Sequence, residues 1–354
     1  MKFKDNWPEA REHWAALWAG RYIRRPCISV CAPSGQPRTV PPPASPEQKW
    51  LDPDYIVRDL LDGMRATWYG GESIPSYLLM AGWVVNTYGA TPRFSMETIW
   101  FDPVAVDWND PPAVTLDLES PWFKKVIAVY TAALAAAGRD DFLVGRGCFM
   151  PGNDMLALVI GAERMMMAMA DHPEWTRSAI LKLARNVVEL QKRFRSIAAQ
   201  THDFWYGNGG WMPFWAPEPF VSTQSDISCM LSPEMYGQFV LPELDLLGRE
   251  FKHVWYHLDG QSAFQHLPRL LSLPYVKVIQ FTPEAGTPAN GPAHLDLYRR
   301  IQKAGKIVHI QVPACNIEPL VKSLDPGLLC IDTWCGSIRE GKELLAAAER
   351  WTAR

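Results

Sequence analysis

The 354-residue chain is longer than an average domain but has the usual size of a single α/β barrel. Apolar residues make up 48% of it, enough for a large core, and the net charge of −3 gives no basic excess for nucleic acid or an anionic membrane. With no apolar stretch of the roughly 18 residues that cross a bilayer, no signal-peptide core and seven scattered cysteines, we expect a cytoplasmic protein with reduced thiols.

The first third of the chain is irregular. Two helices and a strand are expected there: a helix over Trp7 to Trp18, a strand over Pro26 to Cys31 and a helix over Asp54 to Tyr69. A proline-rich loop fills residues 34–53 and has no ability to pair as a strand. Residues 70–119 are broken by glycine and proline, so we treat 1–119 as an N-terminal extension with an irregular insertion.

From about residue 120 strands and helices alternate with short connections, which predicts a parallel sheet. The expected strands are 142–145, 204–206, 253–257, 276–281, 306–312 and 327–333. The expected helices are 122–137, one beginning at 154, 173–199, 233–251, 263–271, 293–304, 317–323 and 339–351. No glycine-rich nucleotide motif follows any strand. The predicted fold is therefore a (β/α)8 TIM barrel formed by residues 1–354 as one domain, with 120–354 as its regular βα repeats.

Three side chains that follow predicted strands have the chemistry of metal ligands. The loops after barrel strands converge on one mouth, which selects His257, Asp259 and Cys335. Residues two apart on an extended segment share a side, so His257 and Asp259 can face one ion. With a thiolate from another strand they would make a three-ligand zinc site with an open position. The alternative is a hydrogen-bonded histidine, a helix-capping aspartate and a buried, inert thiol.

Other residues of the predicted mouth are candidates for catalysis and substrate binding. Asp226 lies on a loop ahead of the helix start at Ser232-Pro233, where its carboxylate could bind substrate or metal or form a loop hydrogen bond. Gln311 ends another predicted strand and is a candidate substrate contact. The best candidates for an aromatic substrate wall, among sixteen tryptophans, are Trp205, Tyr206, Trp211 and Trp215. The alternative for these rings is packing between helices and barrel.

Several short strings follow one another at spacings that resemble a known family. They are Gly152-Asn153-Asp154-Met155-Leu156, Asp171-His172-Pro173-Glu174, Ser225-Asp226-Ile227-Ser228, Leu231-Ser232-Pro233-Glu234-Met235-Tyr236 and His257-Leu258-Asp259-Gly260. Together they resemble the uroporphyrinogen decarboxylase-like superfamily, from about residue 120 to the end and more loosely before it. The resemblance implies a (β/α)8 barrel.

The resemblance favours one of the two chemistries of that superfamily. Its metal-free decarboxylases carry an Arg-Gln-x-Gly-Arg run near the N-terminus, which is missing here because Arg25-Pro26 is followed by Cys27-Ile28-Ser29. Its zinc methyltransferases of corrinoid systems bind zinc through His-x-Cys and a cysteine beyond the last strand. His257 and Cys335 match two of these positions, and Asp259 replaces the middle cysteine. The resemblance thus implies Zn²⁺ and a partner protein that carries a corrinoid (cobalamin).

The implied reaction is methyl transfer from an O-methyl or N-methyl small molecule, or to a thiol or folate acceptor, with zinc as the Lewis acid. An aromatic mouth favours an O-methyl aromatic or a quaternary amine. Asp226 and Asp259 are the expected catalytic carboxylates. Two alternatives stay open: a metal-free decarboxylase or lyase of a small acid that uses Asp226 with Arg146, and a non-catalytic barrel that binds a ligand in its Trp-rich mouth.

Overall fold

The main sheet of the protein has seven strands in the order β2-β1-β11-β10-β9-β8-β7. The computed structural model describes residues 1–79, 81–145, 150–201 and 212–353. The strands of the main sheet are β1 (Cys27–Pro33), β2 (Thr67–Gly71), β7 (Val221–Thr223), β8 (Val254–Asp259), β9 (Val276–Thr282), β10 (Ile307–Gln311) and β11 (Leu329–Trp334). Neighbouring strands are parallel except β1 and β2, so the sheet is mixed and mostly parallel.

The other strands of the described residues form two smaller, two-stranded sheets. Strand β3 (Ser76–Tyr77) pairs in parallel with β6 (Leu143–Val144). Strands β4 (Thr91–Phe94) and β5 (Ile99–Asp102) form an antiparallel hairpin inside the segment that the sequence marks as irregular. This hairpin was not predicted.

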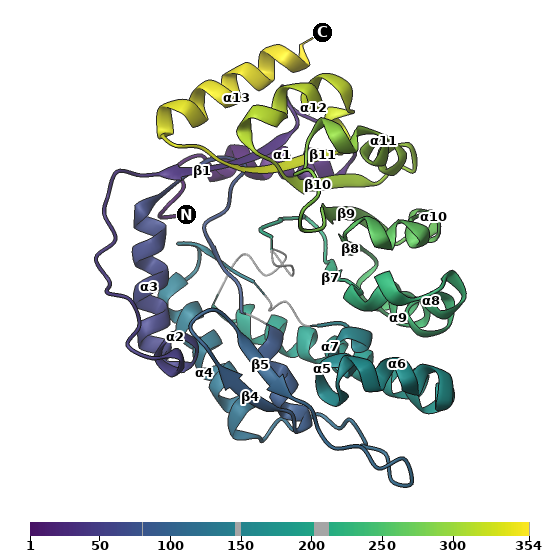
Figure 1. Ribbon diagram of the computed structural model, residues 1–354. Coiled ribbons are helices and arrows are strands. Elements are labelled where there is room, and N and C mark those ends of the chain that lie inside the picture. Colours follow the sequence, from purple (N-terminus) through teal and green to yellow (C-terminus); the bar gives the residue numbers. More distant parts are fainter. Residues whose placement is uncertain (80, 146–149, 202–211, 354) are drawn as a thin grey trace.

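Helices alternate with the strands of the main sheet. They are α1 (Trp7–Trp18), α2 (Pro46–Leu51), α3 (Pro53–Ala66), α4 (Pro121–Ala137), α5 (Gly152–Ile160), α6 (Ala162–Asp171), α7 (Pro173–Ala198), α8 (Pro233–Phe239), α9 (Leu241–Phe251), α10 (Leu267–Ser272), α11 (Leu295–Lys303), α12 (Ile317–Ser323) and α13 (Ile338–Thr352). Short 3-10 helices are η1 (Ala81–Tyr88), η2 (Asp226–Met230), η3 (Gln261–His266), η4 (Pro292–His294), η5 (Ala314–Asn316) and η6 (Pro326–Leu328). Strands β1 and β7 to β11 follow an arc with α8 to α13 on its outer side, and α3 to α7 continue the ring (Figure 1).

The predicted α/β class with a mostly parallel sheet is confirmed. Closure of the strands into an eight-stranded barrel stays a prediction, as does the division at residue 119. Strands β1 and β2, from the part predicted as an extension, pair within the main sheet. Among the described helices none is long and apolar enough to cross a membrane.

Three element boundaries differ from prediction for local reasons. The helix expected to reach Tyr69 ends at Ala66, because Thr67–Gly71 is rich in β-branched and aromatic residues and pairs with β1. The helix expected over 233–251 is divided at Val240 into α8 and α9, because Pro242 has no N–H to bond to the carbonyl four residues before it. Strand β7 lies within a segment predicted as loop. The predicted strand 204–206 lies outside the described residues.

A small aromatic core covers the N-terminal ends of the strands. It includes Cys27, Ile307 and Cys330, which begin or nearly begin β1, β10 and β11. Helix α1 contributes Trp14, whose ring lies 4.8 Å from that of Phe214. This packing fills one end of the strand arrangement, next to a buried ion pair between Arg25 and Glu72.

Candidate functional site

Three polar residues lie side by side on neighbouring strands. His257 on β8 and His309 on β10 are both register partners of Gln280 on β9. Register partners in a parallel sheet project from the same face, and two strand spacings separate the histidines by about 10 Å. Each histidine belongs to a group of side chains close enough to hold a metal ion.

The first group consists of Asp226, His257 and Asp259, and its ligand atoms all lie within 4.8 Å of one another. Asp259 ends β8, and Asp226 opens η2 directly after the short strand β7. His257 Nε2 lies 3.9 Å from Asp259 Oδ1. The imidazole is buried, whereas both aspartates are exposed. The group therefore joins a fixed nitrogen ligand to two carboxylates that remain accessible.

Hydrogen bonds define which nitrogen of His257 carries the proton. The Gln280 amide group donates to Thr282 Oγ1 at 3.0 Å, and its oxygen Oε1 is bonded to His257 Nδ1. An amide oxygen only accepts, so Nδ1 holds the proton and Nε2 has the lone pair. Metal-binding histidines in proteins commonly have this arrangement, with the second nitrogen bonded to a carbonyl or carboxylate. The ring is thus oriented to present a ligand nitrogen to the two aspartates.

A third aspartate, Asp154 at the start of α5, fixes the position of Asp226. The Asp226 backbone N–H donates to both Asp154 carboxyl oxygens, at 3.0 and 3.2 Å, and Gln224 Nε2 donates to Asp226 Oδ2 at 2.6 Å. Burial, and then the neighbouring Asp226, raise the pKa of Asp154 well above its ordinary value. Burial also raises the pKa of Asp226, with a further contribution from Asp259. A cation among these carboxyl groups would relieve their mutual repulsion.

Helix α5 is itself anchored by a buried carboxylate. Glu243 of α9 is bonded to the backbone N–H of Gly152, and it accepts from the backbone of Asn153 at 3.1 Å and from its side chain at 2.9 Å. These bonds cap the positive end of the helix that carries Asp154. A Cβ at Gly152 would lie 2.2 Å from Ile180 O of α7, so the close approach of the two helices requires glycine.

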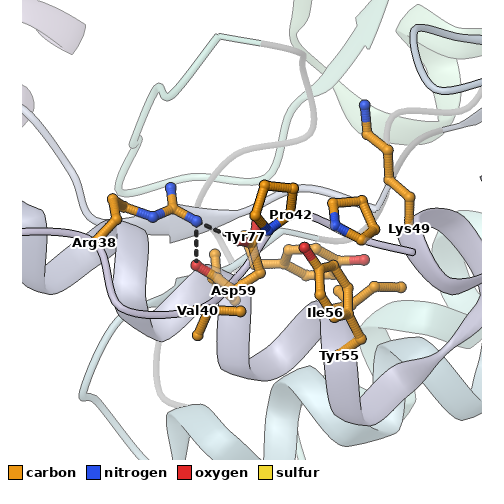
Figure 2. Close-up of a pocket in the computed structure, with 10 residues that line it drawn as sticks. Arg38, Val40, Pro42, Lys49, Tyr55, Ile56, Asp59 and Tyr77 are labelled. Carbon is orange, nitrogen blue, oxygen red and sulfur yellow. Dashed lines mark hydrogen bonds and ion pairs between the residues drawn. The ribbon is translucent and has the colours of Figure 1, made fainter. Parts of the chain in front are cut away.

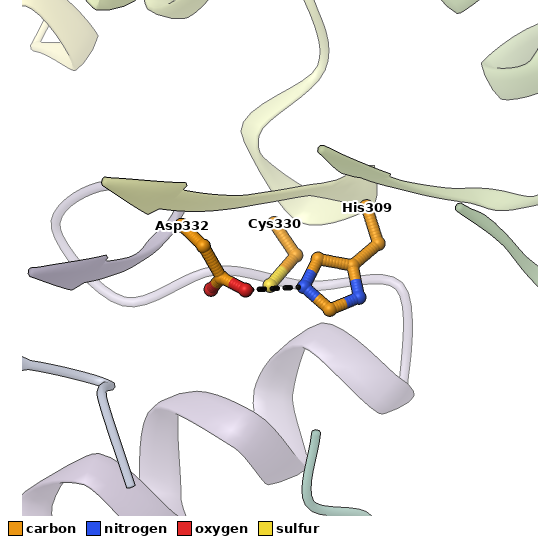
Figure 3. A group of neighbouring side chains, drawn as sticks. All are labelled: His309, Cys330 and Asp332. Atoms are coloured by element: carbon orange, nitrogen blue, oxygen red, sulfur yellow. Dashed lines mark hydrogen bonds and ion pairs between the residues drawn. The ribbon is translucent and has the colours of Figure 1, made fainter. Parts of the chain in front are cut away.

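The second group consists of His309, Cys330 and Asp332, which project from one face of β10 and β11 (Figure 3). The Trp255 indole N–H donates to His309 Nδ1 at 3.0 Å, and His309 Nε2 lies 3.1 Å from Asp332 Oδ2. Indole is only a donor, so His309 Nδ1 accepts its hydrogen bond. His309 Nε2 therefore carries the proton and donates a hydrogen bond to Asp332. Burial raises the pKa of Cys330 well above its ordinary value, which keeps the thiol protonated. The spacing would allow a metal ion, but these proton positions favour the first group for that role.

The predicted site residues fall in different places. Asp226, His257 and Asp259 are brought together. Cys335 belongs to neither group among the described residues: it is buried just after β11, where its backbone N–H donates to Cys31 O at 2.8 Å. Asp226 therefore occupies the place in the ligand set that the sequence assigns to Cys335.

The predicted substrate contacts are also dispersed. Gln311 is exposed at the end of β10 and lines a cavity of about 500 Å³ together with Glu284 and Trp334. Trp215 is buried in the aromatic core at the other end of the strands, with its ring 6.1 Å from that of Trp7. The remaining candidates, Trp205, Tyr206, Trp211 and Arg146, lie outside the described residues.

Sequence reasoning missed Gln280, His309 and Asp332. Each is a polar residue inside an apolar run: Val276-Lys277-Val278-Ile279-Gln280-Phe281, Ile307-Val308-His309-Ile310 and Leu329-Cys330-Ile331-Asp332. Since buried polar groups need hydrogen-bond partners, a polar residue in the interior of a buried strand is a signal that could have identified them.

A separate cavity of about 540 Å³ lies between the proline-rich loop and α3 and includes Pro42, Lys49 and Tyr55 (Figure 2). The Arg38 guanidinium at its edge is paired with Asp59, and with Asp62 at 3.1 Å. None of the residues of the two histidine groups lines it.

The described architecture is an α/β fold with a group that could hold a metal ion. No family model matches the chain, and no curated protein matches it in sequence. A solved structure, a methyltransferase from Methanosarcina mazei, is similar in fold, with a TM-score of 0.61 at 12% sequence identity. The similarity covers 96% of this chain and 98% of that chain. It shows that the two proteins share a fold over nearly their whole length, while membership of the superfamily stays a prediction.

Proposed function

We propose that the protein is a zinc-dependent methyltransferase that acts with a corrinoid-carrying partner protein. The observation that carries the proposal is the hydrogen bond from His257 to Gln280, which leaves the Nε2 lone pair facing Asp226 and Asp259. The shared fold with an archaeal methyltransferase supports the reaction class.

The residues of the first group fit zinc. One imidazole nitrogen and carboxylate oxygens are ligands that zinc accepts in catalytic sites, where three protein ligands leave a position for water or substrate. The ligand set that we propose is His257, Asp226 and Asp259, and Cys335 as a ligand remains an expectation from the resemblance. Compared with a site of one histidine and two thiolates, this set carries the same charge, but its harder carboxylate ligands donate less electron density to the metal, so its zinc would be the stronger Lewis acid.

Zinc bound there would lower the pKa of a thiol acceptor or activate the leaving group of a methyl donor. The chain's own residues would do the positioning. Gln280 holds the imidazole, and Asp154 fixes the Asp226 backbone through two hydrogen bonds. Gln311, on the rim of a neighbouring cavity, is the proposed contact for the small-molecule substrate.

Metal analysis tests the proposal directly. Protein purified without chelator should contain about one equivalent of zinc, and His257→Ala and Asp226→Asn should lose it. Gln311→Ala, an exposed residue two strands away, is the matched control and should keep the metal. Wild-type protein without stoichiometric zinc, or zinc that survives His257→Ala, would contradict the proposed site.

Methyl transfer can be tested with free cob(I)alamin as the surrogate acceptor. Incubation with O-methyl and N-methyl donors should change the cobalamin absorbance in the presence of wild-type protein and not of His257→Ala. Zinc binding without transfer to or from cobalamin would favour the non-catalytic alternative. Carbon dioxide release from a small acid that persists after metal removal would favour the decarboxylase.

A further inference from the structure

We infer that Asp332, Ser29 and Trp334 form a subsite for a protonated amine of the substrate, on the same strand face as the first histidine group. The role of this cation subsite in catalysis rests on the proposed function. Its binding of an ammonium group can be tested independently. It would define the substrate as a small molecule that carries an ammonium group.

The Asp332 carboxylate is held in one orientation. Trp255 donates to His309, and His309 donates to Asp332 Oδ2, so two buried rings fix one oxygen. His309 is completely buried and carries its proton on the nitrogen that faces Asp332. Asp332 is therefore a preorganised negative charge, with Trp255 and His309 as its positioning residues.

The other oxygen of this carboxylate lacks a donor. Among the described residues, Asp332 Oδ1 is buried and has no hydrogen-bond partner. Ser29 on β1 is the register partner of Asp332, so its side chain is on the same face. Ser29 is only 7% exposed, and its hydroxyl also has no partner in the described part of the chain. Buried polar atoms in native proteins are nearly always paired, so the two atoms indicate a ligand that supplies N–H groups.

An exposed aromatic residue follows this pair on the same side of β11. Trp334 is two residues beyond Asp332 on β11 and so shares its side of the strand. The ring is 57% exposed, although large apolar side chains of the chain are mostly buried. It lines two cavities of about 500 Å³, one toward Gln311 and one toward Tyr69. Trp is the best aromatic partner for a cation.

The surrounding charge also favours a cation. Glu284 borders the same cavity as Trp334, while Asp226 and Asp259 lie further along the sheet, at the ends of β7 and β8. On the rim of the cavity toward Tyr69, the Arg38 guanidinium is already engaged by Asp59 and Asp62. The Lys4 ammonium donates to the backbone carbonyl of Gly71 at 2.8 Å.

The second histidine group has a competing interpretation as a metal site. A metal on His309 Nε2 would displace the proton that this nitrogen carries, and Nδ1 cannot take that proton because it accepts from Trp255. The Cys330 thiol, whose pKa burial raises, would also have to ionise. An organic cation needs neither change, because it binds to the ionised carboxylate as it stands.

Binding of propylammonium, propan-1-ol and propionate to the full-length protein tests the subsite by calorimetry. Propylammonium should bind about tenfold more tightly than propan-1-ol, and propionate should not bind. Asp332→Asn should remove the preference for propylammonium over propan-1-ol. Trp334→Ala should weaken the binding of propylammonium about threefold. His309→Ala should reduce the discrimination between propylammonium and propan-1-ol while leaving the binding of propan-1-ol unchanged, which a merely structural role would not do.

Matched controls separate the subsite from general charge and from the proposed function. Asp296→Asn removes a fully exposed carboxylate on α11, and Trp100→Ala removes an exposed ring on β5, so neither should change binding. His257→Ala should lose zinc and keep the ammonium preference. Equal binding of the ammonium and the alcohol, or a preference that survives Asp332→Asn, would overturn the inference even if zinc and methyl transfer are found.

Discussion

The Nδ1–H group of His257 donates to the side-chain oxygen of Gln280, its register partner on the next strand. This bond selects the tautomer in which Nε2 can act as a ligand. Two strand spacings away, Trp255 selects the opposite tautomer of His309 through its indole N–H. Two histidines on one face of the sheet are thus set for different roles by the partner that each one has.

Replacing Gln280 with leucine should weaken zinc binding about 10- to 100-fold, because the imidazole loses the acceptor that fixes its orientation. Competition with a chelator of known affinity measures the change. Gln280→Glu keeps an acceptor and should bind zinc at least as well as wild type. The control Gln311→Leu alters an exposed glutamine on β10. A Gln280→Leu protein with wild-type affinity would show that this bond does not tune the site.

Replacing Trp255 with phenylalanine should turn the second histidine group into a metal site. Without the indole N–H, His309 can hold its proton on Nδ1 and offer Nε2 to a metal together with Cys330 and Asp332. The variant should therefore take up a second equivalent of zinc, measured by titration and metal analysis. The double variant Trp255→Phe/His309→Ala should return to one equivalent. A second equivalent already present in wild type would contradict the assigned tautomer.

The sequence predicts most of the helices and the C-terminal strands because their signals are local. Helix α1 begins and ends where expected, with proline in its first turn, and α12 covers the predicted residues 317–323. The short strand β7 and the hairpin β4–β5 were missed. Strand β7 has only three residues and pairs with β8, about thirty residues further along the chain. The hairpin strands are adjacent in the chain, but they are short, and Pro92 in β4 disfavours a strand assignment.

The site was predicted in part for the same reason. His257 and Asp259 are neighbours in sequence, so their spacing alone places them together. Asp226 joins them only because β7 pairs with β8, and the exclusion of Cys335 from the group depends on where its buried side chain packs. The roles of Gln280 and Trp255 follow from register across three strands, which periodicity along one strand does not reveal.

The stability of the metal-free protein should fall as the pH rises from about 4.5 to about 7. Burial raises the pKa of Glu243 from 4.5 to about 7, so the native state keeps a proton there that the unfolded chain has released. The contribution of Glu243 to the free energy of unfolding therefore decreases across this window, by about 3 kcal/mol, and levels off above it. Urea unfolding at pH 5 and pH 7 measures the difference.

Glu243→Gln should remove the Glu243 contribution and so make the pH dependence less steep, because the glutamine does not titrate. Glu174→Gln is the control, since its side chain is 87% exposed at the start of α7. A slope that is unchanged in Glu243→Gln would assign the pH dependence to other groups, such as the neighbouring carboxyl groups of Asp154 and Asp226.

Replacing Gly260 with alanine should destabilise the protein and disturb the metal group, because this residue forms the turn directly after Asp259. Its φ of +70° costs an L-residue roughly 1–2 kcal/mol, and a Cβ would also lie 2.4 Å from Glu284 Cγ. Thermal unfolding and zinc affinity should both decrease. Gly286→Ala is the matched control: its φ is +81° with nothing within 4 Å of the added Cβ, so it should show only the backbone cost. The double variant Gly260→Ala/Glu284→Ala removes the contact and should recover the stability that Gly260→Ala loses beyond the backbone cost. If Gly260→Ala is no less stable than Gly286→Ala, the close approach of Glu284 does not constrain this turn.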